Sequence, residues 1–254
     1  MKIISLNLWG GRVSGPLFPF LEAHQDVDVF CFQEVFDEKG RDMTALFEAA
    51  AEGTLSDLHA RLSHAMPGHV GIFLPVWNDS YGIATFVRRE IGIAASGSIS
   101  LYENPNFPEI ENDDADHPRS ALRVDLIGER GGLKVVNVHG HWVPSNKSDT
   151  PARLEQSRRL ITAVGENPQR TVLCGDFNLR PDTESVRMIE SAGFRNLVAE
   201  SGVTSTRTGL YKKEERFADY AFVTPDLEVE HFQILPDEVS DHAPLLVEIL
   251  DGSE

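Results

Sequence analysis

Two short segments place acidic, amide and imidazole side chains directly beside apolar runs. The first reads CGDFN at residues 174–178 and follows a β-branched, apolar run. Residues two apart on a strand lie on the same side of the backbone, so Asp176 and Asn178 should direct a carboxylate and an amide to one place. The second reads SDHAP at residues 240–244, where Asp241 and His242 precede a strand-like run. Hard oxygen ligands beside an imidazole suit metal binding and proton transfer.

Four further polar residues stand at or near the ends of other apolar runs. Asn7 closes the first run of the chain and Glu34 directly follows the second. His139 closes a later run, and Asp219 lies inside another, where a carboxylate flanked by apolar residues needs a partner. As single features, Asn7 could be a turn cap and Glu34 a solvated surface residue. The inference therefore depends on the ordered set rather than on any one member.

The segments between these residues alternate between strand-like and helix-like patterns, which indicates an α/β protein. Strands are predicted over 2–8, 27–32, 82–87, 121–127, 133–139, 171–174, 217–223 and 245–250. Helices are predicted over 17–24, 42–51, 55–65, 152–165 and 183–192, the last closed by Gly193. No linker or repeat divides this pattern, so we expect a single domain over residues 1–254.

Length and composition are those of an ordinary globular domain. The chain has 254 residues, 41% of them hydrophobic and 25% charged, and no apolar stretch approaches the roughly 18 residues of a membrane helix. We therefore expect no stable membrane insertion. The first residues alternate like a strand and lack the features of a secretory signal, which predicts a cytoplasmic location. Cys31 and Cys174 lie in apolar runs and are expected to be reduced core thiols.

The formal charge of −17, from 40 acidic and 23 basic residues, opposes non-specific binding to nucleic acids and anionic membranes. A divalent ion would reverse this balance locally. The one conspicuous basic cluster is interrupted by Glu214 and Glu215 and is interpreted as a solvated loop; it consists of Arg207, Lys212, Lys213 and Arg216. His117 and His141 are interpreted as surface imidazoles.

Two segments, 102–118 and 143–151, have the composition of long surface loops, which often carry specificity. The first is acidic and contains three prolines, and it is interpreted either as a solvated surface or as a barrier to polyanions. Aromatic residues near predicted strand ends could stack on a base, a sugar or a tyrosyl group, or could simply pack the core; they are Trp9, Trp77, Tyr81 and Trp142.

Taken in order, the polar set resembles the endonuclease/exonuclease/phosphatase (DNase I-like) family. The resemblance is carried by Asn7, Gln33-Glu34, GDFN at 175–178, Asp219-Tyr220 and SDH at 240–242, and it spans nearly the whole chain. It implies a four-layer α/β sandwich of two mixed β-sheets flanked by helices. The family includes DNase I-like nucleases, apurinic-site endonucleases, tyrosyl-DNA phosphodiesterases, inositol polyphosphate phosphatases and neutral sphingomyelinases.

The resemblance also implies a role for each residue. Glu34 would be the principal ligand of Mg²⁺, or of Mn²⁺ as the alternative ion, with Asn7 and Asp241 close to it. The implied catalytic residues are Asp176, which orients or deprotonates water, Asn178, which holds water and phosphate, the pair Asp219 and His242, and His139 as a donor. Arg119 resembles a phosphate-facing arginine. The residue that accepts the proton of the water, Asp176 or His242, is left open.

The implied function is a Mg²⁺-dependent phosphoesterase that hydrolyses a phosphate ester by in-line attack of an activated water. We expect a substrate of modest size, a nucleotide or a nucleic-acid end among the options, and no protein partner is inferable. The alternatives are a non-catalytic binding module on the same fold, a DNA-repair endonuclease, and a sphingomyelinase-like lipid phosphodiesterase. His139 stands where apurinic-site endonucleases have tyrosine, which argues against the repair enzymes.

Overall fold

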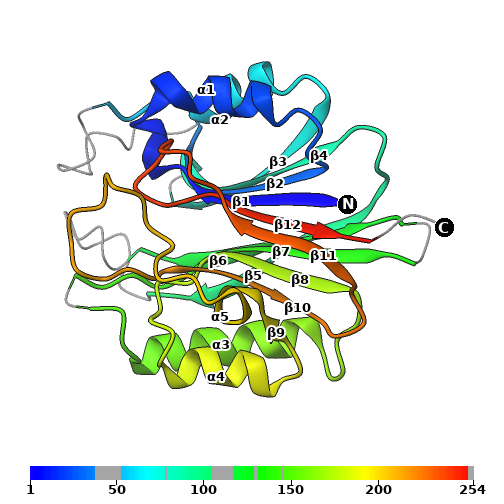
Figure 1. Cartoon of the computed structure of the whole chain (residues 1–254), viewed down its shortest axis with the longest axis vertical. Coiled ribbons are helices and arrows are strands. Elements are labelled where there is room, and N and C mark those ends of the chain that lie inside the picture. Colours follow the sequence, from blue (N-terminus) through cyan, green and yellow to red (C-terminus); the bar gives the residue numbers. More distant parts are fainter. Residues whose placement is uncertain (38–52, 78, 105–116, 129–130, 145, 251–254) are drawn as a thin grey trace.

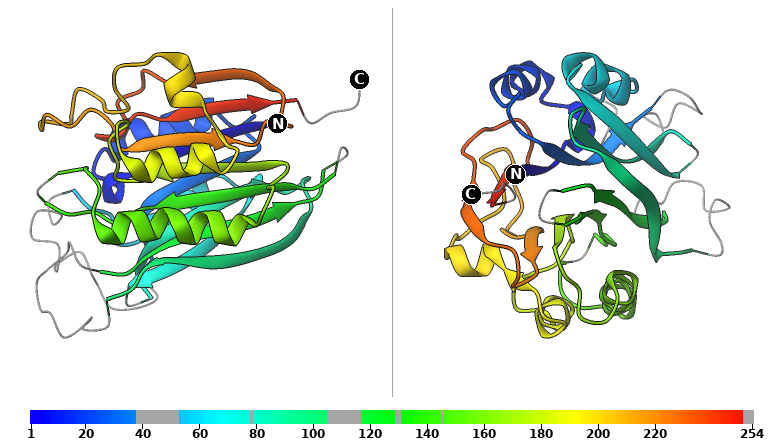
Figure 2. Two further views of the ribbon diagram at one scale, coloured as in Figure 1. Left: turned by 90° about the horizontal axis from the view of Figure 1, so that it is seen from below. Right: turned by 90° about the vertical axis from the view of Figure 1, so that its right-hand side faces the viewer.

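The computed structural model describes residues 1–37, 53–77, 79–104, 117–128, 131–144 and 146–250, and they form four layers (Figure 1). Two six-stranded sheets pack face to face. Helices α1 (Ser14–Ala23) and α2 (Leu58–Ala65) cover the outer face of the first sheet, and α3 (Pro151–Val164) and α4 (Glu184–Ser191) cover the second (Figures 1 and 2). The predicted four-layer α/β sandwich is confirmed.

Each sheet is mixed, with one parallel pair near its centre. The strand orders are β11-β12-β1-β2-β4-β3 and β5-β6-β7-β8-β10-β9. The parallel pairs are β1 (Lys2–Asn7) with β2 (Val29–Phe36), and β7 (Leu133–His139) with β8 (Thr171–Asp176), and all other pairs in the described chain are antiparallel. Because parallel neighbours end at the same edge of a sheet, the polar residues after these four strands are brought to one end of the sandwich.

The remaining strands are β3 (His69–Trp77), β4 (Tyr81–Arg88), β5 (Ile93–Tyr102), β6 (Arg119–Leu126), β9 (Arg195–Asn196), β10 (Asp219–Val223), β11 (Val229–Ile234) and β12 (Leu245–Ile249). All eight predicted strands are present, with bounds shifted by a few residues. Four strands were not predicted, β3, β5, β9 and β11, and they are the four edge strands. β5 and β11 lack continuous apolar runs and β9 has only two residues, whereas β3 reads HVGIFLPVW and its apolar run is interrupted by Gly71 and Pro75. Pro75 is tolerated because β3 is an edge strand.

Four of the five predicted helices are present in the described chain. Thr150 and Thr183 cap α3 and α4 by accepting hydrogen bonds from the backbone N–H of Arg153 and Val186. Gly193 follows α4 with a φ of 97°, as its expected role requires. The predicted helix over 42–51 and most of the loop over 102–118 lie outside the described residues. A single 3₁₀ turn (Trp9–Gly11) and the short helix α5 (Leu197–Ser201) were not predicted.

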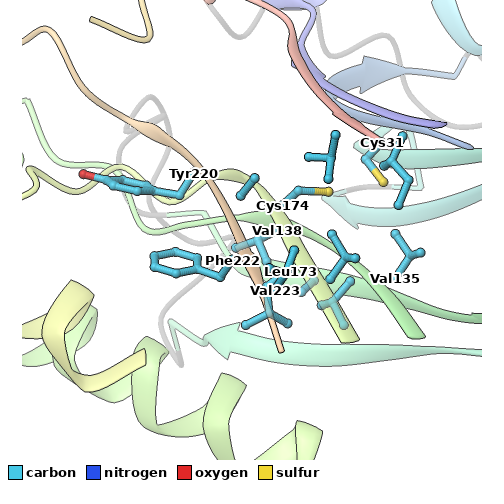
Figure 3. Packing of buried hydrophobic residues seen from close by; sticks show 14 of the residues in the cluster. Cys31, Val135, Val138, Leu173, Cys174, Tyr220, Phe222 and Val223 are labelled. Carbon is cyan, nitrogen blue, oxygen red and sulfur yellow. The ribbon is translucent and has the colours of Figure 1, made fainter. Parts of the chain in front are cut away.

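The largest hydrophobic cluster fills the space between the two sheets and continues beneath α3 and α4. Figure 3 shows part of it, with Val135, Val138 and Leu173 on the strands of the second sheet and Phe222 beside them. Cys31 and Cys174 are fully buried and free, as predicted, and burial raises the pKa of the Cys31 thiol. In the described part of the chain, no helix is long and apolar enough to cross a membrane.

A buried amide network ties the two sheets together beside the polar end. Asn137 on β7 donates to the backbone oxygens of Phe32 (3.1 Å) and Ala84 (3.0 Å) on the opposite sheet. Gln33 on β2 donates to Asn137 Oδ1 at 2.7 Å. Both amides are fully buried. These bonds fix the register of one sheet over the other, one residue from Glu34 and two from His139.

Candidate active site

The polar residues predicted from the sequence meet at the end of the sandwich that lies away from the N-terminus (Figure 1). Asn7, His139 and Asp176 are the last residues of β1, β7 and β8. The strand register places His139 and Asp219 on either side of Asp176. Asp241 and His242 arrive in the loop before β12. The convergence of these residues therefore follows directly from the sheet topology.

Glu34 is positioned by a β-bulge. The sequence analysis placed it after a strand, but β2 continues to Phe36, and the register with β4 shifts between Phe32 and Val35. Glu34 has a left-handed φ of 55° in this bulge. A bulge redirects a side chain away from the regular alternation of the strand, and such features are common beside active sites. The carboxylate consequently points into the pocket instead of following the pleat.

Asn7 connects two of the carboxylates. Its Nδ2 donates to Glu34 Oε1 (3.0 Å) and to Asp176 Oδ2 (3.1 Å), while its Oδ1 accepts from the backbone N–H of Trp9 (2.9 Å). The side chain is fully buried. Asn7 therefore joins residues from both sheets and also fixes the turn that carries Trp9.

His242 is held by Asp219. Its Nδ1 donates to both carboxylate oxygens of Asp219, at 2.8 and 2.9 Å, and Thr206 Oγ1 donates to Asp219 Oδ2 at 3.1 Å. Its other ring nitrogen, Nε2, lies 3.6 Å from Asp176 Oδ2. Burial and Arg207 lower the pKa of His242, but the neighbouring carboxylates outweigh them and the pKa is raised. The imidazolium of His242 therefore persists to higher pH than that of an ordinary histidine.

Asp176 remains ionised although it is buried. Burial raises the pKa of its carboxyl, but the positive charges of His242, Lys147 and Arg207 lower it more strongly, and the net shift is downward. Its Oδ1 accepts from the backbone N–H of Asn178 at 2.9 Å. Asn178 has a left-handed φ of 55°. β8 ends at Asp176, so the strand alternation used in the prediction does not place Asn178; its backbone N–H contacts the carboxylate, and both residues line the pocket.

Arg119 and His139 form a second pair in the pocket wall, with His139 Nε2 4.0 Å from Glu34 Oε1. Arg119 Nη1 donates to His139 Nε2 at 2.8 Å, and both side chains are buried. A guanidinium has only donors, so the imidazole nitrogen facing it must accept. Burial and the Arg119 charge lower the pKa of His139 well below its usual value, which keeps the ring neutral. Arg119 Nε has no hydrogen-bond partner in the described chain, so this arginine retains a free donor.

These residues line one pocket of about 290 Å³. Of the predicted residues, the ones that form its wall are Glu34, Arg119, His139, Asp176, Asn178, Asp241 and His242. Asn7 and Asp219 lie behind this wall, where they position Glu34, Asp176 and His242. Every predicted residue is thus either in the wall or in direct contact with it.

Three interpretations from the sequence are wrong. Arg207 is not a solvated loop residue, because its side chain is buried and forms an ion pair with Asp241 (3.2 Å) in the pocket wall. His117 is buried, stacks on Trp77 and lines the pocket, and His141 is buried against Tyr102. All three lie in irregular segments, where the sequence has no periodicity from which burial could be predicted.

The mouth of the pocket carries three pairs of a cation and an aromatic ring. The guanidinium of Arg12 lies 4.8 Å from the ring centroid of Trp9, that of Arg207 lies 4.2 Å from Tyr211, and Lys213 Nζ lies 5.7 Å from Trp142. All six residues line the pocket. Trp9 has a left-handed φ of 50°, an unfavourable conformation for a bulky residue. Trp9, Tyr81 and Trp142 line the pocket, whereas Trp77 packs behind it.

The donor set fits a hard divalent cation on the Glu34 side of the pocket. Burial raises the pKa of Glu34, and the negative charges of Asp241 and Asp176 raise it further. The hydrogen bond from Asn7 and the charge of His242 lower it, but the net shift is upward. A cation would relieve this repulsion, and carboxylate and amide oxygens are the ligands that Mg²⁺ and Mn²⁺ prefer. Asp176, Asp219 and His242 also lie close enough to share an ion, but Asp219 and His242 already bind each other.

A family model described as the endonuclease/exonuclease/phosphatase family matches residues 4–242. The chain belongs to this family. Among curated proteins no sequence matches significantly. Solved structures of the same architecture include a mannosyl-6-phosphatase from Bacteroides thetaiotaomicron, with 21% identity, a TM-score of 0.71, and 98% of this chain and 99% of that chain covered.

A second protein of the endonuclease/exonuclease/phosphatase family from the same organism has a TM-score of 0.74 at 21% identity, covering 98% of this chain and 97% of that one. TDP2 from D. rerio, complexed with a single-strand DNA product, has a TM-score of 0.67 at 16% identity, with 97% of each chain covered. At these identities the likeness shows the shared fold. Family membership itself accounts for the order of the polar residues along the chain.

Proposed function

We propose that this member of the endonuclease/exonuclease/phosphatase family is a Mg²⁺-dependent phosphoesterase that hydrolyses a small phosphate ester by in-line attack of water. One observation carries the proposal: a cluster of carboxylates and a set of donors suited to phosphate line the same pocket. Glu34, Asp176 and Asp241 supply the carboxylates, and Arg119 and Asn178 lie in the wall with them. Such a pocket can hold an attacking water and a phosphate next to each other.

Each residue then has a role that its geometry supports. Glu34 and Asp241 would hold the ion, which would supply charge neutralisation and polarise the phosphoryl oxygen. Asn7, expected from the sequence close to the ion, directs its Nδ2 at Glu34 and its Oδ1 at the Trp9 N–H, so it would position Glu34. Asp176 is ionised and accepts a hydrogen bond, which suits the orientation of a water molecule. His242, kept protonated by Asp219, is placed to meet negative charge on the phosphate.

Arg119 and His139 act as a unit in the pocket wall. The guanidinium of Arg119 suits a phosphate oxygen, whereas His139 accepts from Arg119 through Nε2. The role first expected for His139, a direct donor to the phosphate or leaving group, thus passes to Arg119 in this proposal. His139 would orient the guanidinium.

The mouth of the pocket favours a leaving group that contains a ring. Cations over aromatic faces at Trp9 and Trp142 provide stacking surfaces and positive charge, and the third pair, at Tyr211, adjoins the reaction centre because Arg207 also binds Asp241. The pocket volume of about 290 Å³ suits a sugar phosphate, a nucleotide or the end of a single strand, and long duplex DNA is disfavoured by the net charge of −17.

Hydrolysis of p-nitrophenyl phosphate and bis-p-nitrophenyl phosphate with and without Mg²⁺ tests this proposal. We expect Mg²⁺-dependent turnover that falls at least about 100-fold in E34Q, as expected when one device of the site is removed. E166Q makes the same substitution at an exposed residue and should retain activity. Equal activity in E34Q and wild type would refute the site, and no turnover of any ester would favour a binding module.

A substrate panel then separates the classes. Sugar phosphates, nucleotides, a single-stranded oligonucleotide, supercoiled plasmid and a sphingomyelin vesicle are compared under the same conditions. We expect turnover of the small or single-stranded esters, and efficient nicking of plasmid at physiological salt would contradict the proposed substrate size.

A further inference from the structure

Lys147 is a buried lysine that the roles proposed above do not use. It lies in the irregular segment between β7 and α3, its residue is only 4% exposed, and it does not belong to the wall of the pocket. Its Nζ donates to Asn178 Oδ1. Its backbone oxygen accepts from Arg180 N at 2.9 Å, which pins the segment to the chain that follows Asn178. In the described chain Asn178 is therefore its one hydrogen-bonding contact with the site, while its charge also acts on Asp176.

The burial of this ammonium group is costly. Among the described residues no carboxylate lies within 4.0 Å of Lys147 Nζ, and its one hydrogen-bond partner is a neutral amide. Burial lowers the pKa of Lys147 to about 8, against the attraction of Asp176 and Asp219, while Arg207 and Arg153 act with the burial. Lysine is almost never fully buried unless it is paired, so a compensating role is expected.

The segment is built to hold Lys147 in place. Arg153, which is fully buried, donates to the backbone oxygens of His141 (3.1 Å), Ser148 (2.6 Å) and Asn146 (2.9 Å). These bonds anchor the chain on both sides of Lys147. The backbone that carries Lys147 is thus held in one position by Arg153.

The ammonium group of Lys147 determines which way the Asn178 amide faces. A lysine ammonium has three donors and no acceptor, so the amide must present its oxygen to Lys147. Nδ2 then points the other way, where one of its two protons is donated to Gly140 O at 3.1 Å. The second proton remains for a ligand in the pocket, whose wall Asn178 forms. Without the lysine, the orientation of the amide would be held by its bond to Gly140 O alone.

We propose that Lys147 is a positioning residue that locks the Asn178 amide with its N–H, and not its C=O, facing the phosphate. The proposal rests on the proposed function, because it assigns a phosphate to this pocket. It predicts that Lys147 acts on phosphate only through Asn178, and that a neutral donor in its place retains most of the effect.

Three variants test this prediction: K147M removes the donor, K147Q retains an N–H donor without the charge, and K134M makes the same change at a half-buried lysine at the opposite end of β7. Turnover of bis-p-nitrophenyl phosphate and calorimetric binding of inorganic phosphate, both with Mg²⁺, are measured for each. We expect K147M to lower kcat and phosphate affinity at least about ten-fold, K147Q to stay within about three-fold of wild type, and K134M to match wild type.

The double variant K147M/N178A decides whether the lysine acts through the amide. We expect K147M to cause no further loss in the N178A background, because the group it orients is gone. Equal losses in both backgrounds, or a K147Q as weak as K147M, would overturn the proposal. Thermal unfolding excludes a folding defect, because removing a buried, unpaired charge should leave the melting temperature of K147M unchanged or raised.

The two proposals fail differently. If wild type binds phosphate in a Lys147-dependent manner but hydrolyses no ester, the hydrolase assignment fails and the role of Lys147 stands. If turnover is Mg²⁺-dependent and K147M is as active as wild type and binds phosphate as tightly, the role of Lys147 fails alone. If wild type neither binds phosphate nor hydrolyses an ester, both fail.

Discussion

The pairing of Asp219 with His242 gives the sharpest mutational prediction. In D219N the negative charge is lost and one of the two oxygens becomes an NH₂ group. Both oxygens of Asp219 lie within 2.9 Å of His242 Nδ1, so either orientation of the new amide places a donor against this nitrogen. The imidazolium carries a proton there, and two donors meet. The variant therefore disfavours the charged ring and does more than remove an attraction.

The size of the effect follows from the two contributions. A hydrogen bond to a charged group is worth about 1.5–3 kcal/mol, and a buried polar group left without a partner costs about 1–3 kcal/mol. A combined loss of about 2.5–6 kcal/mol corresponds to about 10²–10⁴ in kcat. The pH dependence should change as well. Because the pKa of His242 is raised, activity that needs the imidazolium persists above pH 6.5 and falls as pH rises through the folded-state pKa. In D219N this fall should move to lower pH.

The assay compares kcat for bis-p-nitrophenyl phosphate between pH 5 and 10 in wild type, D219N, D219A and D125N. Asp125 pairs with Arg123 on β6, away from the pocket, and controls for the substitution itself. In D219A a water can accept the Nδ1 proton, so D219N should be at least as impaired as D219A. If D219N were clearly more active than D219A, or if its pH profile matched that of wild type, the reasoning would be refuted.

Three further predictions follow from other contacts. Millimolar Mg²⁺ should raise the melting temperature of wild type but not of E34Q. A ligand that binds only the folded state stabilises that state by about 2.7 kcal/mol at 100 times Kd. An equal rise in wild type and E34Q would place the ion elsewhere. N137A should lower the free energy of unfolding in urea by about 2–4 kcal/mol, because it removes buried bonds between the sheets and leaves Gln33 with fewer partners; a loss below about 1 kcal/mol would show that the network is not structural. W142A should raise KM for a ring-bearing ester several-fold and leave KM for glycerol phosphate unchanged, and equal changes for both would argue against stacking at the mouth.

The sequence predicted the interior of this fold better than its margins. The eight predicted strands are the inner strands of the two sheets, where burial on both faces produces short apolar runs. β5 reads IAASGSISLY and β11 reads VEHFQI, and their small or polar residues match exposed edge positions. An edge strand is defined by its neighbour, and a single sequence contains little information about which neighbour it will have.

The site shows the same division. Four site residues lie at strand ends and could be located from the neighbouring apolar runs: Asn7, His139, Asp176 and Asp219. The family resemblance then assigned their expected roles. Lys147, Arg207 and His117 come from irregular segments, and nothing in their local sequence indicates that they are buried. Arg153 holds the segment of Lys147, Asp241 pairs with Arg207, and Trp77 stacks on His117. None of these contacts can be recognised from the local sequence. Burial of polar residues in irregular segments is a tertiary property.

The chemistry of this pocket depends on how the two sheets are aligned, because neither sheet alone holds a complete set of groups. The first sheet carries Asn7 and Glu34, and the second carries His139 and Asp176. Asn7 spans the junction, with one carboxylate from each sheet on its amide. The amide network of Gln33 and Asn137 lies next to this junction along the chain. A shift of one sheet over the other would therefore break the network and would also separate Glu34 from Asp176. Alignment of the sheets, rather than any single loop, is therefore the step of folding that assembles the site.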